Sequence, residues 1–280
     1  MKKTAIIFAA LLACFQLFAQ TEAEQKTSMD EYRTRYNRQV KNVGYSGVGV
    51  ETILDRWEAD YPDEIEPKVG RINYLLDKSK SFELVQSADS RYLGQRPIAT
   101  MKDENGKDVN YYNDVVYDEE YFAQCQKLID ECVSKYPNEL RYRFCKINTL
   151  LDYEKEYPDM TEGEINALID EMDKLWTVDG IPATREVFID SIQEYCYSLY
   201  SVSTPASYDA FYNISTRMHN LFPKNSSFLD NLGSYWLVSQ KNFKKAISLY
   251  NKALKLDPED PVALKNKAVA ENLLARSKKK

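Results

Sequence analysis

One segment near the C-terminus constrains the fold more than any other part of this sequence. Residues 228–258 read FLDNLGSYWLVSQKNFKKAISLYNKALKLDP, in which apolar side chains recur at helical spacing in two successive stretches. Pro258 closes the second stretch, because proline cannot continue a helix. The small side chains of Gly233, Ala246 and Ala253 fall where two antiparallel helices would have to cross closely. The segment therefore predicts a tightly packed helix pair.

This segment resembles the tetratricopeptide repeat, of the kind found in exported bacterial proteins. The turn between its helices is one residue longer than the family's usual turn. Similar second-helix endings occur upstream as WEADYP, CVSKYP and MHNLFP, and the last of these places Pro223 35 residues before Pro258, which is one repeat with one extra residue. The resemblance assigns structural repeat positions to Leu232, Gly233, Trp236, Phe243, Ala246, Tyr250, Ala253 and Pro258.

We therefore expect an all-α fold, an antiparallel helix-pair (tetratricopeptide-like) solenoid with a small β-hairpin insertion. The helical repeat domain spans 46–276, with its best repeat at 226–260, and a basic tail follows at 277–280. Residues 20–45 form a tether and an N-terminal helix that Ser28 and Glu31 cap, and Thr161 with Glu164 predicts a second cap. The insertion covers 80–116, where the turn Glu104–Lys107 separates two strand-like runs, 98–101 and 109–112.

The N-terminus predicts export. Lys2 and Lys3 precede an apolar stretch that is too short to span a membrane, as in a signal peptide covering residues 1–19. Cleavage after Ala19 would give a soluble protein, whereas the run before Cys14 resembles a lipoprotein box and would make Cys14 an acylated N-terminus. We favour cleavage after Ala19, because apolar residues continue past Cys14. Either route places the protein in the periplasm or on the outer-membrane surface, with membrane attachment only through a lipidated Cys14.

Charge and residue types argue against several functions. The net charge is −6 and becomes −8 once the signal lysines are removed, so a phosphate backbone is a poor partner and no nucleic-acid binding is expected. The single histidine, His219, next to a predicted helix end, leaves no basis for a histidine-dependent catalytic site. The four mature cysteines match no zinc pattern, and they are expected as buried packing residues. We expect no metal, no cofactor and no enzymatic activity.

The tetratricopeptide resemblance implies a binding protein whose concave face is lined by first helices. Carried over from the motif, that face should include Arg71, Tyr142, Lys146 and Ser234. The lysine and asparagine with which some family members grip a terminal carboxylate are replaced here by Asp230 and Ser234, so that binding mode is not expected. The sequence thus predicts a non-enzymatic protein- or peptide-binding scaffold of the bacterial cell envelope. The alternative is a glycan-binding accessory protein of an outer-membrane uptake system, which the abundant tyrosines would permit.

Overall fold

The computed structural model describes residues 27–278, so the predicted signal peptide and Cys14 lie outside the described residues. The described chain is mostly helical with a small antiparallel sheet, which confirms the predicted helical class with a β insertion. In this part of the chain, no helix is both long and apolar enough to cross a membrane. The chain divides into two compact units, one ending at Lys78 and the other beginning at Ser79.

The first unit consists of α2 (Met29–Val43), α3 (Val50–Asp60) and α4 (Ile65–Ser79). Ser28 caps α2 as predicted, since its hydroxyl accepts from the Glu31 backbone N–H at 3.2 Å. The rings of Tyr32 and Trp57 stack 5.8 Å apart, so α2 packs directly on α3. The helix assigned to 20–45 in the sequence is therefore an integral part of this unit.

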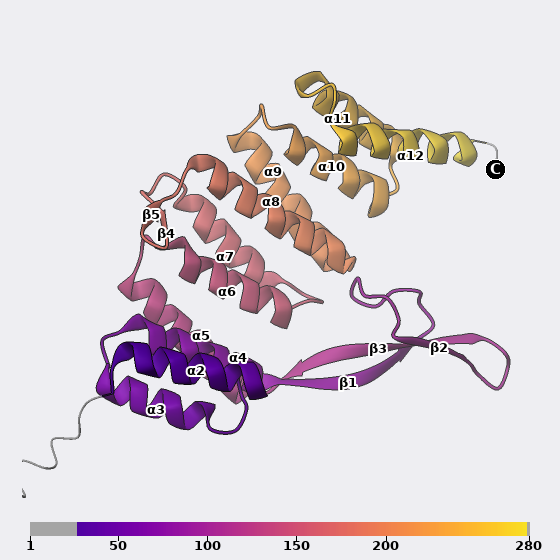
Figure 1. Ribbon diagram of the computed structural model, residues 1–280. Helices are drawn as coiled ribbons and strands as arrows, with labels where there is room; N and C mark the ends of the chain where they lie inside the picture. Colours follow the sequence, from indigo (N-terminus) through magenta and orange to yellow (C-terminus); the bar gives the residue numbers. More distant parts are fainter. Residues whose placement is uncertain (1–26, 279–280) are drawn as a thin grey trace, which may run out of the picture. The chain divides into compact units, whose positions relative to one another are not determined.

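The helices of the second unit follow one another with short connections (Figure 1). They are α5 (Glu119–Lys135), α6 (Leu140–Tyr153), α7 (Asp159–Asp170), α8 (Arg185–Val202), α9 (Pro205–Leu221), α10 (Ser226–Val238), α11 (Phe243–Leu256) and α12 (Pro261–Ser277). A shared apolar core runs from Leu140 on α6 to Tyr235 on α10. The cap predicted at Thr161 is wrong, because α7 already begins at Asp159 and the Thr161 hydroxyl donates to Glu154 at 3.1 Å.

The C-terminal helix pair α10–α11 is closely packed and is flanked by α12. A Cβ at Gly233 would lie only 2.6 Å from the Tyr250 ring, which explains the absence of a side chain at this crossing. The second-helix positions Ala246, Tyr250 and Ala253 are fully buried. Leu232 is also buried, and Trp236 and Phe243 are partly buried against this cluster.

The insertion forms a three-stranded antiparallel sheet in the order β1-β3-β2, with β1 (Lys80–Ser87), β2 (Ala99–Lys102) and β3 (Asp108–Tyr117) (Figure 1). Strands β2 and β3 are the predicted hairpin, and its turn contains Gly106 at φ 74°. Strand β1 was not predicted. A two-stranded ribbon of β4 (Thr177–Val178) and β5 (Ile181–Pro182) joins α7 to α8.

The loop 88–97 covers one face of the sheet and fixes it to the helices. Tyr112 is fully buried beneath this loop, and its hydroxyl donates to the Asp89 carbonyl at 2.5 Å. The loop meets α8 at Gly94, whose φ is 77°, and a Cβ there would lie 2.1 Å from the Ser201 carbonyl oxygen. Only glycine fits both requirements, so the contact depends on this residue.

The base of the sheet is fixed independently by a carboxylate on α6. Asp152 accepts hydrogen bonds from the Lys80 ammonium at 2.7 Å and from the Tyr117 hydroxyl at 2.5 Å. Two strands and one helix thus meet at a single charged group. The sheet is held at two separate places on the second unit.

Candidate functional site

Helices α5, α6 and α7 enclose a groove of about 730 Å³ in the second unit. This volume suits a short segment of a partner chain, since ligand pockets typically measure about 300–1,000 Å³. The groove has one polar end and one apolar end. It is lined by Glu119, Phe122, Ala123, Gln126, Asp130, Lys146, Leu150, Tyr153, Met160, Gly163 and Glu164.

The polar end is organised around Lys146. Its ammonium lies 2.9 Å from an Asp130 oxygen and 2.6 Å from a Glu164 oxygen. Burial opposes the charge, but these two carboxylates outweigh it and the pKa of Lys146 is raised. The ammonium is therefore held between two acids from α5 and α7, and the groove carries more negative than positive charge.

A neighbouring amide presents an unused acceptor. The Gln126 Nε2 atom donates to the Thr149 hydroxyl at 2.7 Å, and that hydroxyl donates to the Lys146 carbonyl at 2.9 Å. Because the single hydroxyl proton of Thr149 is already committed, Gln126 must direct its NH₂ group toward it, which fixes the amide orientation. The Gln126 Oε1 atom is left buried without a hydrogen-bond partner among the described residues. Such an acceptor is costly to leave empty, so a donor from a ligand would be favoured there.

The apolar end is built on two stacked rings. Phe122 and Tyr153 lie 4.1 Å apart with an interplanar angle of 14°, and Tyr117 packs edge-on against both. Met160 on α7 completes this end and is 48% exposed. Phe122 is only 5% exposed, so solvent reaches this apolar end at Met160 and at the exposed Ala123.

Of the four residues predicted for the concave face, only Lys146 lines this groove. Arg71 belongs to the first unit, where its guanidinium pairs with Asp55 and Glu58. Tyr142 is buried, and so is Ser234, which lies 3.1 Å from the Tyr250 hydroxyl. These three side chains are engaged within the fold, and their predicted role in binding stays a prediction.

The sequence reasoning did not single out Gln126 or Asp130, and it assigned Glu164 to a helix cap and not to a binding site. The spacing Phe122–Gln126–Asp130 places three side chains on one face of α5, which was the available signal. The Lys146–Glu164 ion pair joins α6 to α7, and residue spacing within either helix does not predict it.

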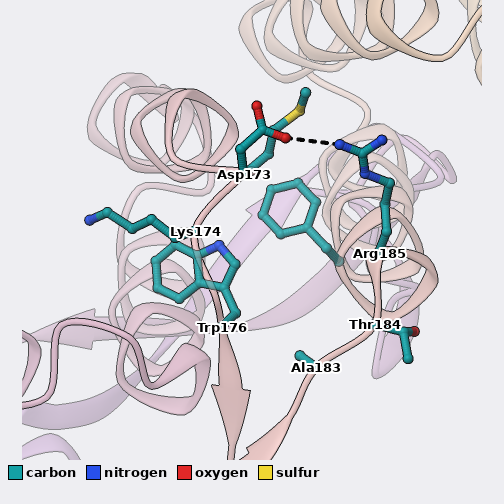
Figure 2. Close-up of a pocket in the computed structure, with 8 residues that line it drawn as sticks. Asp173, Lys174, Trp176, Ala183, Thr184 and Arg185 are labelled. Carbon is teal, nitrogen blue, oxygen red and sulfur yellow. Dashed lines mark hydrogen bonds and ion pairs between the residues drawn. The ribbon is translucent and has the colours of Figure 1, made fainter.

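A smaller pocket of about 190 Å³ lies where the β4–β5 ribbon meets α8 (Figure 2). Arg185 pairs with Asp173 at 2.8 Å across its rim. Trp176 is buried and Lys174 lies 5.6 Å from its ring centre, so the indole has no free face for a sugar. The volume equals roughly that of six water molecules, and its charges are already paired. It is a weaker candidate than the groove.

A buried carboxyl pair lies between α10 and α12. Asp230 is 4% exposed, and its Oδ1 atom has no hydrogen-bond partner within the described chain. Its neighbour Asp260 caps α12 by accepting from the backbone N–H groups of Val262 and Ala263 at 2.9 and 3.2 Å. Burial and the adjacent Asp260 raise the pKa of Asp230 to about 8, so the pair holds one proton near neutral pH.

The described residues offer no cluster suited to a metal ion and no disulfide. Between residues 27 and 278, no three His, Cys, Asp or Glu side chains are placed to hold a metal ion. Cys125, Cys132 and Cys196 are buried, Cys145 is partly buried, and none of the four forms a disulfide within the described residues. Burial raises the pKa of Cys125 and Cys196 to about 12. These thiols are poor nucleophiles and serve as packing residues.

Comparison with known proteins assigns no family to the chain. No family model matches the sequence, and no curated protein is detectably similar to it.

Proposed function

We propose that this protein is a non-enzymatic, tetratricopeptide-like scaffold that binds a segment of a partner protein in the bacterial cell envelope. The observation that carries the proposal is the α5–α7 groove, with its split between a charged end and an apolar end. A segment with a polar part followed by an apolar part would contact both ends of the groove at once.

The helix packing supports the repeat architecture. From α5 to α7 and from α8 to α12, successive helices contact one another, and α7 contacts α9. The α10–α11 crossing at Gly233 and Tyr250 has the small-against-large complementarity that the motif requires. Helix-pair arrays of this kind act as extended binding surfaces rather than as catalysts.

The groove favours a protein segment over a glycan. Sugar binding uses an exposed aromatic face, whereas Phe122 is 5% exposed and its ring stacks on that of Tyr153. The unused Gln126 acceptor suits a backbone N–H or a basic side chain. Glycan binding is the alternative proposal, and retention on a polysaccharide gel would support it.

Photo-crosslinking tests the proposal directly. A photoreactive amino acid at Met160, on the groove rim, should crosslink one envelope protein when the exported chain is expressed in its host. Ala123→Arg should abolish this crosslink, because Ala123 is an exposed groove residue and arginine would fill the apolar end. The matched control is Ala275→Arg, at an exposed position of α12 outside the groove, which should leave the crosslink unchanged. Equal loss in both variants, or no crosslink at Met160, would contradict a binding role for the groove.

The proposal places the mature protein in the periplasm or on the outer-membrane surface. The mass of the mature N-terminus would distinguish cleavage before Gln20 from acylation at Cys14. A chain that keeps Met1 in the envelope fraction would contradict both routes.

A further inference from the structure

The two faces of the β1-β3-β2 sheet differ sharply. One face is covered by the loop 88–97, under which Tyr112 and Asn110 are buried. Because paired residues of antiparallel strands share a face, the register assigns eleven residues to the opposite side. The pair at its base, Lys80 and Tyr117, is bound to Asp152 on α6. We call the rest of this side the open face; it consists of Phe82, Leu84, Gln86, Ala99, Met101, Val109, Tyr111, Asn113 and Val115.

The open face is apolar and accessible. Phe82, Leu84 and Met101 are 67%, 61% and 60% exposed, although each is a large apolar side chain. The nine residues carry no charge, in a chain in which 29% of residues are charged. An apolar surface of this kind, on a sheet fixed to the helices at Asp152 and Gly94, is typical of an interaction surface.

The order of side chains on the open face is self-complementary. An apolar cluster of Phe82, Leu84 and Val115 lies near the base of the sheet, and a second apolar cluster, around Tyr111 and Met101, lies toward the hairpin turn.

The exposed amide of Asn113 lies opposite Leu84 and that of Gln86 lies opposite Tyr111, so the two amides occupy adjoining rows in the middle of the open face. A two-fold rotation about this middle region would place each cluster of one copy on the other cluster of its partner. It would also bring the amides together, and amides both donate and accept hydrogen bonds.

We propose that the open face binds a second copy of this chain, sheet against sheet, to form a weak symmetric dimer. Charge supports this occupant: the face adds no charge to the contact between two acidic chains, and the hairpin extends away from α5 (Figure 1). Size sets the strength, since nine residues are fewer than half of the roughly 20–30 that each side of a standard interface contributes. Dissociation constants on the order of 100 µM are expected for an interface of this class.

Sedimentation velocity of the chain from Gln20 to Lys280 tests the proposal over a concentration range from roughly a tenth to ten times the expected constant. The weight-average mass should rise from monomer toward dimer. Leu84→Lys should raise the dissociation constant at least tenfold, because two ammonium groups would be desolvated at the contact. Circular dichroism checks that the variant folds, as we expect because the Leu84 side chain is 61% exposed in the wild type.

Ile98→Lys is the matched control, because Ile98 is 64% exposed but precedes β2 and alternates with Ala99, away from the open face. It should leave the dimer unchanged. A monomer at every concentration, or equal weakening by both variants, would overturn the proposal. Flotation with phosphatidylcholine vesicles covers a lipid occupant: vesicle binding by a monomeric chain that Leu84→Lys abolishes would also overturn it.

Discussion

Replacing Asp230 with asparagine should remove a pH dependence of stability that one buried proton creates. Asp260 is stabilised as a carboxylate. Burial alone would raise its pKa, but hydrogen bonds from Asp230, the α12 backbone and Ser226 outweigh burial and lower the pKa. Asp230 has no comparable donors and therefore carries the proton. Asparagine keeps the size and the donor of a protonated aspartic acid but cannot ionise.

The direction in which stability changes with pH follows from the difference between the folded and unfolded pKa of Asp230. The pKa of Asp230 rises to about 8 in the folded state, against about 3.9 unfolded, so folding takes up one proton between these values. Stability from this group is full below the unfolded pKa and declines as pH rises, by about 1.36 kcal/mol per pH unit, until pH 8. From pH 5 to pH 7, the unfolding free energy of wild type should fall by about 2.7 kcal/mol relative to that of the variant. Asp260 acts in the opposite direction, but only below its unfolded pKa, outside this window.

Denaturant unfolding of wild type and Asp230→Asn at pH 5, 6 and 7 measures the difference directly. The unfolding free energy of the variant should rise relative to that of wild type at each pH step, by about 2.7 kcal/mol in total. In thermal unfolding, this difference corresponds to roughly 5–10 °C in Tm. Comparing the two proteins cancels the titration of all other groups. Asp190→Asn, at an exposed position of α8, should show no such trend. A constant difference between wild type and Asp230→Asn would refute the assignment of the proton to this pair.

Three further predictions concern packing. Gly94→Ala should release the loop 88–97 from α8, because its Cβ would collide with the Ser201 carbonyl; hydrogen exchange in the loop should rise, and unchanged protection would contradict the contact. Gly233→Ala should lower the unfolding free energy by about 1–3 kcal/mol, since its Cβ would overlap the Tyr250 ring. Urea unfolding measures this loss, and an unchanged unfolding free energy would contradict the close crossing. The four described cysteines should react with Ellman's reagent at pH 8 only after denaturation, because three are buried and burial raises the pKa of those with resolved shifts; rapid native labelling would contradict this.

Local signals predicted much of this fold. Prolines and caps marked the helix ends, and the turn at Asn105-Gly106 marked the hairpin, because these features depend on backbone geometry that few residues allow. The strand β1 was missed, although Phe82 and Leu84 alternate with polar neighbours. Strand β1 pairs with β3, which lies at the other end of the insertion, and the sequence of β1 alone does not indicate which segment it pairs with.

The candidate site was less accessible to prediction, because burial is not local. The motif placed Ser234 on an outward face, yet α10 lies between neighbouring helices on both sides and its hydroxyl is buried against Tyr250. Lys146 was identified through the same motif, but its two carboxylate partners come from α5 and α7. Contacts between helices decide which charges are free, and periodicity within one helix does not carry that information.

The sheet has a consequence for the history of the chain. Its first and last residues, Lys80 and Tyr117, pair directly, and just outside them the Asp118 N–H donates to the Ser79 carbonyl at 2.7 Å. The segment 80–117 therefore begins and ends at almost the same point, so excising it would require closing a gap of only about 5 Å. Such a closed excursion can be gained, lost or exchanged without moving Ser79 away from Asp118. The helical framework and the sheet are thus free to evolve as separate modules.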